Sequence, residues 1–185
     1  MTKHALIIVD LQNDFCPGGS LAVTDGDKIV PVVNRLIRTF EEAGQPIFAT
    51  RDWHPANHCS FQDQGGPWPP HCVQNTIGAE FHPDLKLPPG ATVISKATSA
   101  QREAYSGFDG TDLASRLKLA EVDTVTVCGL ATDYCVKGTV SDGLSEGFKV
   151  TVVENGIRGV NVKPGDSEKA LTEMKRNGAL VASGE

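Results

Sequence analysis

Short, unbroken apolar runs alternate along this chain with segments whose apolar residues recur at helical spacing. Residues 5–9, ALIIV, show no polar alternation, which is typical of a strand buried on both faces of a sheet. The runs expected to form strands are 5–9, 46–50, 91–95, 124–128, 148–153 and 179–182. The first expected helix begins near Lys28 and stops at Gly44. Three more helices are expected, at 111–119, from 136 to about 146, and at 167–177. This alternation predicts a doubly wound α/β fold, with about six parallel strands and helices on both faces.

Polar side chains stand at the carboxyl ends of four successive expected strands. Asp10 follows the first strand, Asp52 and His54 follow the second, and Lys96 follows the third. The fourth strand leads into a turn that carries Cys135. Any one of these residues alone fits a capping, solvated or packing role. Because ligands of doubly wound sheets bind beyond the carboxyl ends of the strands, the four together predict a functional site there.

The turn after the fourth strand has the features of a nucleophile position. Gly129 is expected to end the strand, and Thr132 and Asp133 are residue types that cap helix N-termini. Cys135 would then lie in the first helical turn, where the helix dipole and free backbone N–H groups favour a thiolate. The same N–H groups could hold the oxyanion that forms when a thiolate attacks a carbonyl.

The other strand ends supply what such a nucleophile needs. Asp10 is the expected general base and acid, and Lys96 would stabilise the ionised forms of Asp10 and Cys135 by Coulomb attraction. The alternative is a binding or redox-sensing module in which Cys135 is an oxidisable thiol. The presence of Asp10 and Lys96 at neighbouring strand ends argues against it.

A metal site is predicted in the long irregular segment 52–90, which is rich in Pro and Gly. Both tryptophans and four of the five histidines lie in this segment, a composition that argues against disorder. Asp52, His54 and His71 form a set of one carboxylate and two imidazoles. That set suits a divalent transition metal with open positions for water or substrate.

Composition limits the number of domains, the partners and the cellular location expected of the protein. The length of 185 residues suits a single domain, and with a net charge of −6 and no run of Lys or Arg, nucleic acid is not an expected partner. No apolar run is long enough for a membrane span, and the N-terminal run breaks at Asp10, so we expect a strand there and not a signal peptide. Five cysteines without C-x-x-C spacing predict a reducing cytoplasm and no disulfide framework.

Six stretches of the sequence together carry a resemblance to a known family. They are DLQNDFCPGG (10–19), DWHPANHCSF (52–61), WPPHCV (68–73), Lys96, YSGF (105–108) and GLATDYCV (129–136). In this order the stretches resemble the nicotinamidases, also called pyrazinamidases, of the isochorismatase-like cysteine hydrolases. The resemblance spans nearly the whole chain, so 1–185 is expected to be one isochorismatase-like hydrolase domain in which 52–90 is the metal- and substrate-binding loop.

The resemblance implies an amidohydrolase of NAD salvage that converts nicotinamide to nicotinate and ammonia through a cysteine thioester, and that also accepts pyrazinamide. It implies a catalytic triad of Asp10, Lys96 and Cys135. It also implies a metal on Asp52, His54 and His71 that binds the pyridine nitrogen of the substrate. Zinc is the first expectation for this metal, with iron and manganese as alternatives. His58 matches a histidine that ligates the metal in some members of the family and not in others.

The resemblance also implies the surroundings of the substrate. A cis peptide bond between Leu130 and Ala131 would aim the N–H groups of Ala131 and Cys135 at the oxyanion. Phe15 and Trp68 match aromatic residues that stack on the substrate ring, and Tyr105 matches a further residue of the pocket. The expected partner is therefore a small molecule, and a homo-oligomer is left open.

The chain departs from the pattern at residues 62–67, QDQGGP, a loop that is short beside many relatives. It leaves the acidic fourth metal ligand of some members without a match, since Gln64 stands near that place, and so the identity of the metal stays open. The rival function is a related cysteine amidohydrolase acting on another small amide or a carbamoyl compound. The metal set with Trp68 argues against it, because an acyclic amide has no ring nitrogen to anchor. An isochorismate-type hydrolase is weaker still, because that branch does not need Cys135.

Overall fold

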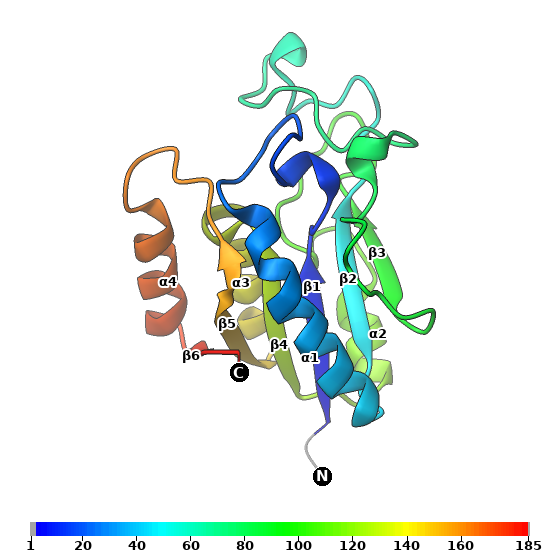
Figure 1. The fold of residues 1–185 in the computed structure, drawn as a ribbon, viewed down its shortest axis with the longest axis vertical. Helices are drawn as coiled ribbons and strands as arrows, with labels where there is room; N and C mark the ends of the chain where they lie inside the picture. The colour runs from blue at the N-terminus through cyan, green and yellow to red at the C-terminus, as the bar shows by residue number, and fades with distance from the viewer. Residues whose placement is uncertain (1–2, 185) are drawn as a thin grey trace.

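The computed structural model describes residues 3–184, in which six strands form one parallel sheet (Figure 1). Their order across the sheet is β3-β2-β1-β4-β5-β6, and each neighbouring pair runs parallel. The predicted doubly wound α/β fold with about six parallel strands is confirmed. The strands are β1 (His4–Val9), β2 (Ile47–Asp52), β3 (Thr92–Lys96), β4 (Thr124–Leu130), β5 (Lys149–Arg158) and β6 (Leu180–Ala182).

Helices cover both faces of the sheet. The helix α1 (Val30–Glu42) packs on one face and lies in front of the sheet in Figure 1. The other three are α2 (Leu113–Leu119), α3 (Lys137–Ser145) and α4 (Asp166–Arg176), and all contribute to the core on the opposite face. Alternate residues of β1 divide between these two cores, as the period of two in a strand requires: Leu6 packs toward α1 and Ile7 toward the other helices.

One apolar stripe packs the helix α1 against the sheet. Val30, Val33, Ile37 and Phe40 recur at three- and four-residue spacing and are buried. The predicted start near Lys28 falls instead in a short 3-10 turn that leads into the helix. The α-helix therefore begins at Val30, later than the apolar pattern predicted. Its place in the chain is otherwise as expected.

Two strands run further than predicted, and the extension places functional residues inside the sheet. β2 continues past residue 50 to Asp52, and β3 ends at Lys96 and not at 95. Asp52 and Lys96 are direct partners in the β2–β3 register, and the Trp53 N–H donates to the Lys96 carbonyl at 3.1 Å. Backbone pairing therefore fixes both residues more rigidly than loop positions would.

The prediction that Gly129 ends the fourth strand was wrong. β4 continues through Leu130, and Gly129 pairs with Val9 of β1 while adopting a φ of +120°. A Cβ at this position would come within 2.1 Å of the Val9 carbonyl oxygen, so only glycine lets the two strands approach so closely. The pairing of β4 with β5 shifts register between Val127 and Gly129.

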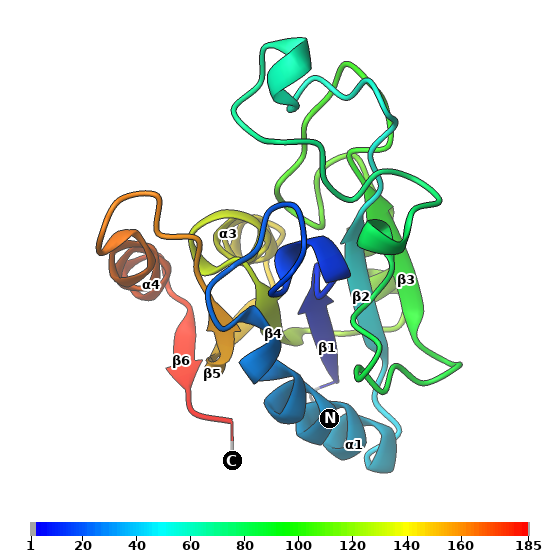
Figure 2. The same cartoon turned by 45° about the horizontal axis from the view of Figure 1, so that its top comes forward.

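The segment between β2 and β3 rises above the carboxyl ends of the strands (Figures 1 and 2). It contains short 3-10 turns, and isolated bridges join His54 to Val73 and Phe61 to Trp68. The Cys72 side chain is fully buried in the core on the α1 face and ties the segment to the body of the protein, while the fully buried Phe61 packs against histidines of the segment itself. An irregular segment of this length is held in place by such anchors rather than by regular secondary structure.

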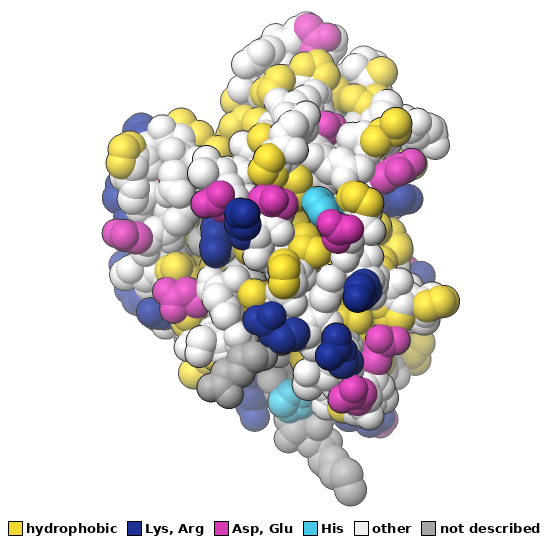
Figure 3. Space-filling view, viewed as in Figure 1, with side chains coloured by type: hydrophobic (Ala, Val, Ile, Leu, Met, Phe, Trp, Pro, Cys, Tyr) yellow, Lys and Arg dark blue, Asp and Glu magenta, His cyan; other side chains and the backbone are white. Residues whose placement is uncertain are grey.

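The surface carries charges of both signs. On the face shown in Figure 3, Lys and Arg side chains are interspersed with Asp and Glu. Within residues 3–184, no helix combines the length and the apolar character that crossing a bilayer requires.

The packing of α1 gives a direct test of the fold. We expect Ile37→Ala to lower the free energy of unfolding by about 2–5 kcal/mol, because Ile37 is only 2% exposed and its removal leaves a cavity. Leu119→Ala is the matched control, because Leu119 is 86% exposed and its truncation should change stability by about 0.5 kcal/mol or less. Urea unfolding of both variants measures the difference, and equal losses would contradict the assigned burial of α1.

Candidate active site

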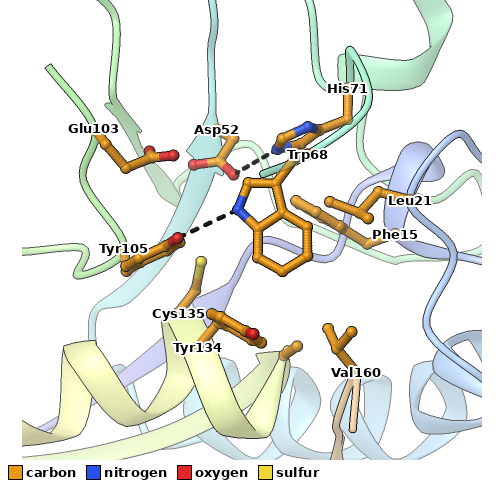
Figure 4. A pocket seen from close by; sticks show the side chains of 11 residues that line it. Phe15, Leu21, Asp52, Trp68, His71, Glu103, Tyr105, Tyr134, Cys135 and Val160 are labelled. Atoms are coloured by element: carbon orange, nitrogen blue, oxygen red, sulfur yellow. Dashed lines mark hydrogen bonds and ion pairs between the residues drawn. The ribbon is translucent and has the colours of Figure 1, made fainter. Parts of the chain in front are cut away.

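A cavity at the carboxyl ends of the strands brings together residues from distant parts of the chain (Figure 4). It lies at the edge of the sheet where ligands bind in doubly wound folds. Its lining combines aromatic rings, carboxylates, an imidazole and one thiol. The lining residues are Phe15, Leu21, Asp52, Trp68, His71, Glu103, Tyr105, Ala131, Tyr134, Cys135 and Val160.

The ammonium group of Lys96 is the centre of the arrangement beneath this cavity. Its Nζ lies 2.9 Å from Asp10 Oδ2, 2.5 Å from Asp52 Oδ1 and 3.5 Å from Cys135 Sγ. It also donates to the Ala104 carbonyl at 3.1 Å, and the side chain is fully buried. The structure therefore brings together the three residues predicted as a triad and joins them to a predicted metal ligand.

Asp10 is held in place from two sides. One carboxylate oxygen accepts a hydrogen bond from the Thr50 hydroxyl at 2.7 Å, and the other faces Lys96. The backbone at Asp10 adopts a φ of +46°, a region that few non-glycine residues occupy, and this bends the chain away from the sheet. A carboxylate oxygen of Asp10 also lies within 4.8 Å of the Cys135 sulfur, so Asp10 is within reach of the thiol proton.

Burial and neighbouring charges shift the pKa values of these groups in different directions. Burial alone would lower the pKa of Lys96, but the carboxylates of Asp10 and Asp52 outweigh it and raise that pKa well above its usual value. Burial would raise the pKa of Asp52, but the attraction of the Lys96 ammonium opposes it and the pKa is lowered. Burial, assisted by the charge of Asp52, raises the pKa of Asp10 despite the attraction of Lys96. Lys96 thus remains an ammonium, and Asp10 is the more readily protonated of the two carboxylates.

The surroundings of Cys135 act against the thiolate that the turn alone would favour. Burial raises the pKa of Cys135 well above that of a free thiol, and the negative charges of Asp10 and Asp52 add to this effect. The attraction of Lys96 opposes the shift without reversing it. A thiol with a raised pKa needs a base to take its proton before it attacks, and the Asp10 carboxylate lies beside it.

The turn that carries Cys135 is wound differently from the prediction. Neither Thr132 nor Asp133 caps a helix: residues Thr132–Val136 form one π-helical turn, closed by the Val136 N–H donating to the Ala131 carbonyl at 3.0 Å. The Asp133 carboxylate instead accepts from the backbone N–H groups of Val160 and Asn161. Cys135 still lies directly before α3, as expected, and the Leu130–Ala131 peptide bond is cis.

Asp52, His54 and His71 converge as the metal prediction requires. Asp52 Oδ2 lies 3.5 Å from His54 Nε2 and 3.9 Å from His71 Nε2. The Nδ1 atoms of the two histidines face the carbonyls of Ala97 and Pro69, at 3.2 and 2.8 Å, so each ring donates there and turns the lone pair of Nε2 toward Asp52. His54 Nε2 is buried and has no hydrogen-bond partner within residues 3–184. These observations fit a site for a divalent cation.

His58 lies beside this group but its ring nitrogens are already engaged. Its Nδ1 lies 2.7 Å from the Ser60 hydroxyl, and its Nε2 donates to the Arg102 carbonyl at 3.0 Å. The ring stacks on that of His54 with centroids 4.0 Å apart. In this arrangement His58 supports His54 and does not turn a free nitrogen toward Asp52. Gln64 is exposed and does not line the cavity.

Aromatic residues form the upper walls of the cavity. Phe15 packs beside His71, with ring centroids 5.5 Å apart, and the indole N–H of Trp68 donates to the Tyr105 hydroxyl at 3.2 Å. Figure 4 shows the Trp68 ring above Cys135, with Phe15 to one side and Tyr105 to the other. All three aromatic residues predicted for the substrate pocket therefore line it.

Several lining residues were missed by the sequence reasoning. Tyr134 packs edge-on against Trp68, with centroids 5.1 Å apart, and its position beside Cys135 could have suggested it. Glu103 precedes the predicted Tyr105 by two residues in a polar loop, which is a weak signal. Leu21 and Val160 come from segments without any motif, and tertiary packing alone brings them to the cavity.

Comparison with known proteins places these features in a wider group. The Isochorismatase domain family matches residues 4–185 of the chain. A nicotinamidase from Escherichia coli is 46% identical over 98% of this chain and 95% of its own length. A pyrazinamidase of Pyrococcus horikoshii, solved in complex with zinc, is 54% identical with a TM-score of 0.94 and covers 98% of this chain and 99% of its own. PnC1 from L. infantum, solved in complex with nicotinate, is 37% identical with a TM-score of 0.89 over 98% of this chain and 93% of its own.

The position of Lys96 predicts its effect on the thiol. In Lys96→Met the stem is nearly preserved and the cation is lost, so the pKa of Cys135 should rise further. At any fixed pH below that pKa, alkylation of Cys135 should then slow by about tenfold or more, which corresponds to one pKa unit or more. Peptide mass spectrometry of iodoacetamide labelling across pH measures the rate at each cysteine.

Two buried thiols serve as internal controls for this experiment. Burial raises the pKa of Cys16 to about 11 and that of Cys128 to about 12, and neither shift includes a contribution from Lys96. Their labelling should not change in the variant. An unchanged profile at Cys135 would show that Lys96 does not tune this thiol.

Proposed function

The chain belongs to the isochorismatase family, and we propose that Cys135, Asp10 and Lys96 carry out its hydrolysis of nicotinamide to nicotinate and ammonia, a step of NAD salvage. The observation that carries the assignment of roles is the buried Lys96 ammonium, which touches both the Asp10 carboxylate and the Cys135 sulfur. The same cavity is lined by Asp52 and His71 of the metal site and by aromatic walls suited to a flat ring. Pyrazinamide, a ring amide of similar shape, is expected to be a second substrate.

The first half of the reaction forms a thioester. Asp10 takes the proton of the Cys135 thiol as the sulfur bonds to the amide carbon, and the carbonyl electron pair moves onto oxygen. The backbone N–H groups of Ala131 and Cys135 are the proposed donors to this oxyanion. When the electron pair returns, the carbon–nitrogen bond breaks, and the leaving nitrogen takes the proton from Asp10 and departs as ammonia.

The second half of the reaction releases the acid. Asp10, again a carboxylate, takes a proton from a water molecule as its oxygen attacks the thioester carbon. Collapse of this intermediate breaks the carbon–sulfur bond, and the proton held by Asp10 returns to the Cys135 sulfur. Lys96 stays protonated throughout and stabilises whichever of its neighbours is negatively charged. The raised pKa of Asp10 suits a group that must both accept and donate a proton.

The metal site orients the substrate in this account. Asp52, His54 and His71 would hold one divalent transition ion, zinc being the ion named in the solved relative, and it would supply a Lewis-acidic position for the ring nitrogen. Phe15 and Trp68 would bracket the ring, and Tyr105 would fix the Trp68 indole through their hydrogen bond. The amide carbon is then presented to Cys135 on the opposite wall.

We also propose a cellular location for the enzyme. All five cysteines are free thiols, and a nucleophilic thiol needs a reducing environment, which supports a cytoplasmic location. The proposed substrate is a small neutral molecule, and aromatic rings line the cavity that would receive it.

Removal of the thiol tests the proposed nucleophile. We expect Cys135→Ala to reduce turnover of nicotinamide by roughly 10⁴-fold or more while the protein stays folded, because no thioester can form. Cys135→Ser should also be poor, since a hydroxyl ionises far less readily than a thiol. Ammonia release measures turnover and circular dichroism checks the fold. Substantial activity in a folded Ala variant would contradict the assignment.

Loss of the metal tests the anchoring role. Nicotinamide and benzamide share the amide and the ring shape, but benzamide has no ring nitrogen. Chelation, or His54→Ala, should therefore lower kcat/KM for nicotinamide strongly and that for benzamide little, which erases the preference between the two. If the metal instead activated the attacking water, both amides would lose rate by a similar factor.

His58→Ala is the matched control for this experiment. Both of its ring nitrogens are bound to protein groups, so its removal should leave the metal bound with weaker affinity and preserve the preference for nicotinamide. Metal release as complete as in His54→Ala would show that His58 is itself a ligand.

A further inference from the structure

The side chain of Gln12 is fully buried between β1, β2 and the long segment above the sheet. Its Nε2 donates to the Asp52 carbonyl at 2.8 Å and to the Ala79 carbonyl at 2.9 Å. Its Oε1 accepts from the Asp52 backbone N–H at 2.8 Å. Both amide protons of Gln12 are thus used, and two of its three hydrogen bonds go to the backbone of one residue.

The hydrogen bonds between the Gln12 side chain and the Asp52 backbone take the place of strand pairing beyond the point where β1 leaves the sheet. The last backbone bond between β1 and β2 runs from the Asp10 N–H to the Thr50 carbonyl, at 3.1 Å. Beyond it the chain bends, and the inward N–H and C=O groups of Asp52 would lose their partner. The amide of Gln12 supplies one donor and one acceptor to those groups, as a neighbouring strand would.

The backbone of Asp52 is consequently fixed on both sides. Gln12 holds it on the β1 side, and it is paired with Lys96 of β3 on the other. This matters because the two oxygens of the Asp52 carboxylate have different partners. Oδ1 binds the Lys96 ammonium, and Oδ2 faces the Nε2 atoms of His54 and His71. A shift of the Asp52 backbone would move one oxygen toward Lys96 at the expense of the cation site.

We propose that Gln12 is a positioning residue of the metal site: it holds Asp52 so that Oδ2 stays directed at His54 and His71. This inference rests on the proposed function, in which those three residues hold the cation. Gln12 does not touch substrate or the ion, and it acts only through Asp52. Groups that orient the ligands of a metal commonly contribute about 10–100-fold to its affinity.

The experiment compares two glutamines that bind backbone in the same region. Gln12→Met keeps the length of the side chain and removes all three hydrogen bonds. Gln74→Met is the matched control, because Gln74 Nε2 also donates to two carbonyls, those of Trp53 and Thr98, and so ties the chain beside Asp52 without touching it. Gln12→Glu is a second variant that preserves the shape and the acceptor but loses the two donors.

Zinc affinity is measured directly, by competition of each apo protein with a chromophoric chelator. We expect the Kd for Zn²⁺ to rise about 10–100-fold in Gln12→Met and Gln12→Glu, and about twofold or less in Gln74→Met. Excess Zn²⁺ should restore the preference for nicotinamide over benzamide in both Gln12 variants. Restoration by metal distinguishes a displaced ligand from general damage to the fold.

The outcomes separate this inference from the function on which it rests. Unchanged zinc affinity in the Gln12 variants, or equal losses in the Gln74 variant, would overturn the positioning role while leaving the metal site intact. Failure of both Gln12 variants to fold would also overturn it, because Gln12 would then support the fold and not the ligand. A wild-type protein that binds no zinc would instead contradict the proposed function itself.

Discussion

One buried ammonium determines how the site of this protein is built. Lys96 ends the edge strand β3, and its side chain is fully buried among two carboxylates and a thiol. A lone charge in such a place would be very costly, and it persists because Asp10 and Asp52 compensate it. Each of these carboxylates in turn depends on Lys96 to be buried. The charged residues of the site therefore also stabilise one another, and removing Lys96 would leave two carboxylates in the interior without their cation.

Asp52 connects the two halves of the site. Through one oxygen it belongs to the charge cluster of Lys96, and through the other it belongs to the histidine group that fits a cation. Its backbone is fixed by strand pairing on one side and by the amide of Gln12 on the other. Asp52 therefore links the metal site, which would hold the substrate ring, to the charge cluster that contains the attacking thiol. This arrangement gives a fixed distance between anchor and nucleophile, which is the main way such a site can favour a near-attack geometry.

The sequence predicted the parts of this arrangement that follow from topology. Asp10, Lys96 and Cys135 could be placed together because the ends of parallel strands meet at one edge, and Asp52 with His54 and His71 formed a recognisable ligand set. The rest depends on three-dimensional environment. Burial raises the pKa of Cys135, which its place in the turn could not show. The close approach of Gly129 to Val9, which continues β4, also depends on tertiary contact. Gln12 lies within the motif DLQNDFCPGG, but nothing local shows that its side chain reaches Asp52, 40 residues away.

Hydrolysis through a thioester on Cys135 is tested most directly by a partition experiment. Nicotinamide and methyl nicotinate would give the same acyl-enzyme, so in hydroxylamine the holoenzyme should convert both to hydroxamate and nicotinate in one common ratio at each hydroxylamine concentration. That ratio should rise with hydroxylamine concentration equally for the two substrates. Different ratios from the amide and the ester, or formation of nicotinate without any hydroxamate, would contradict a shared thioester and with it the role of Cys135.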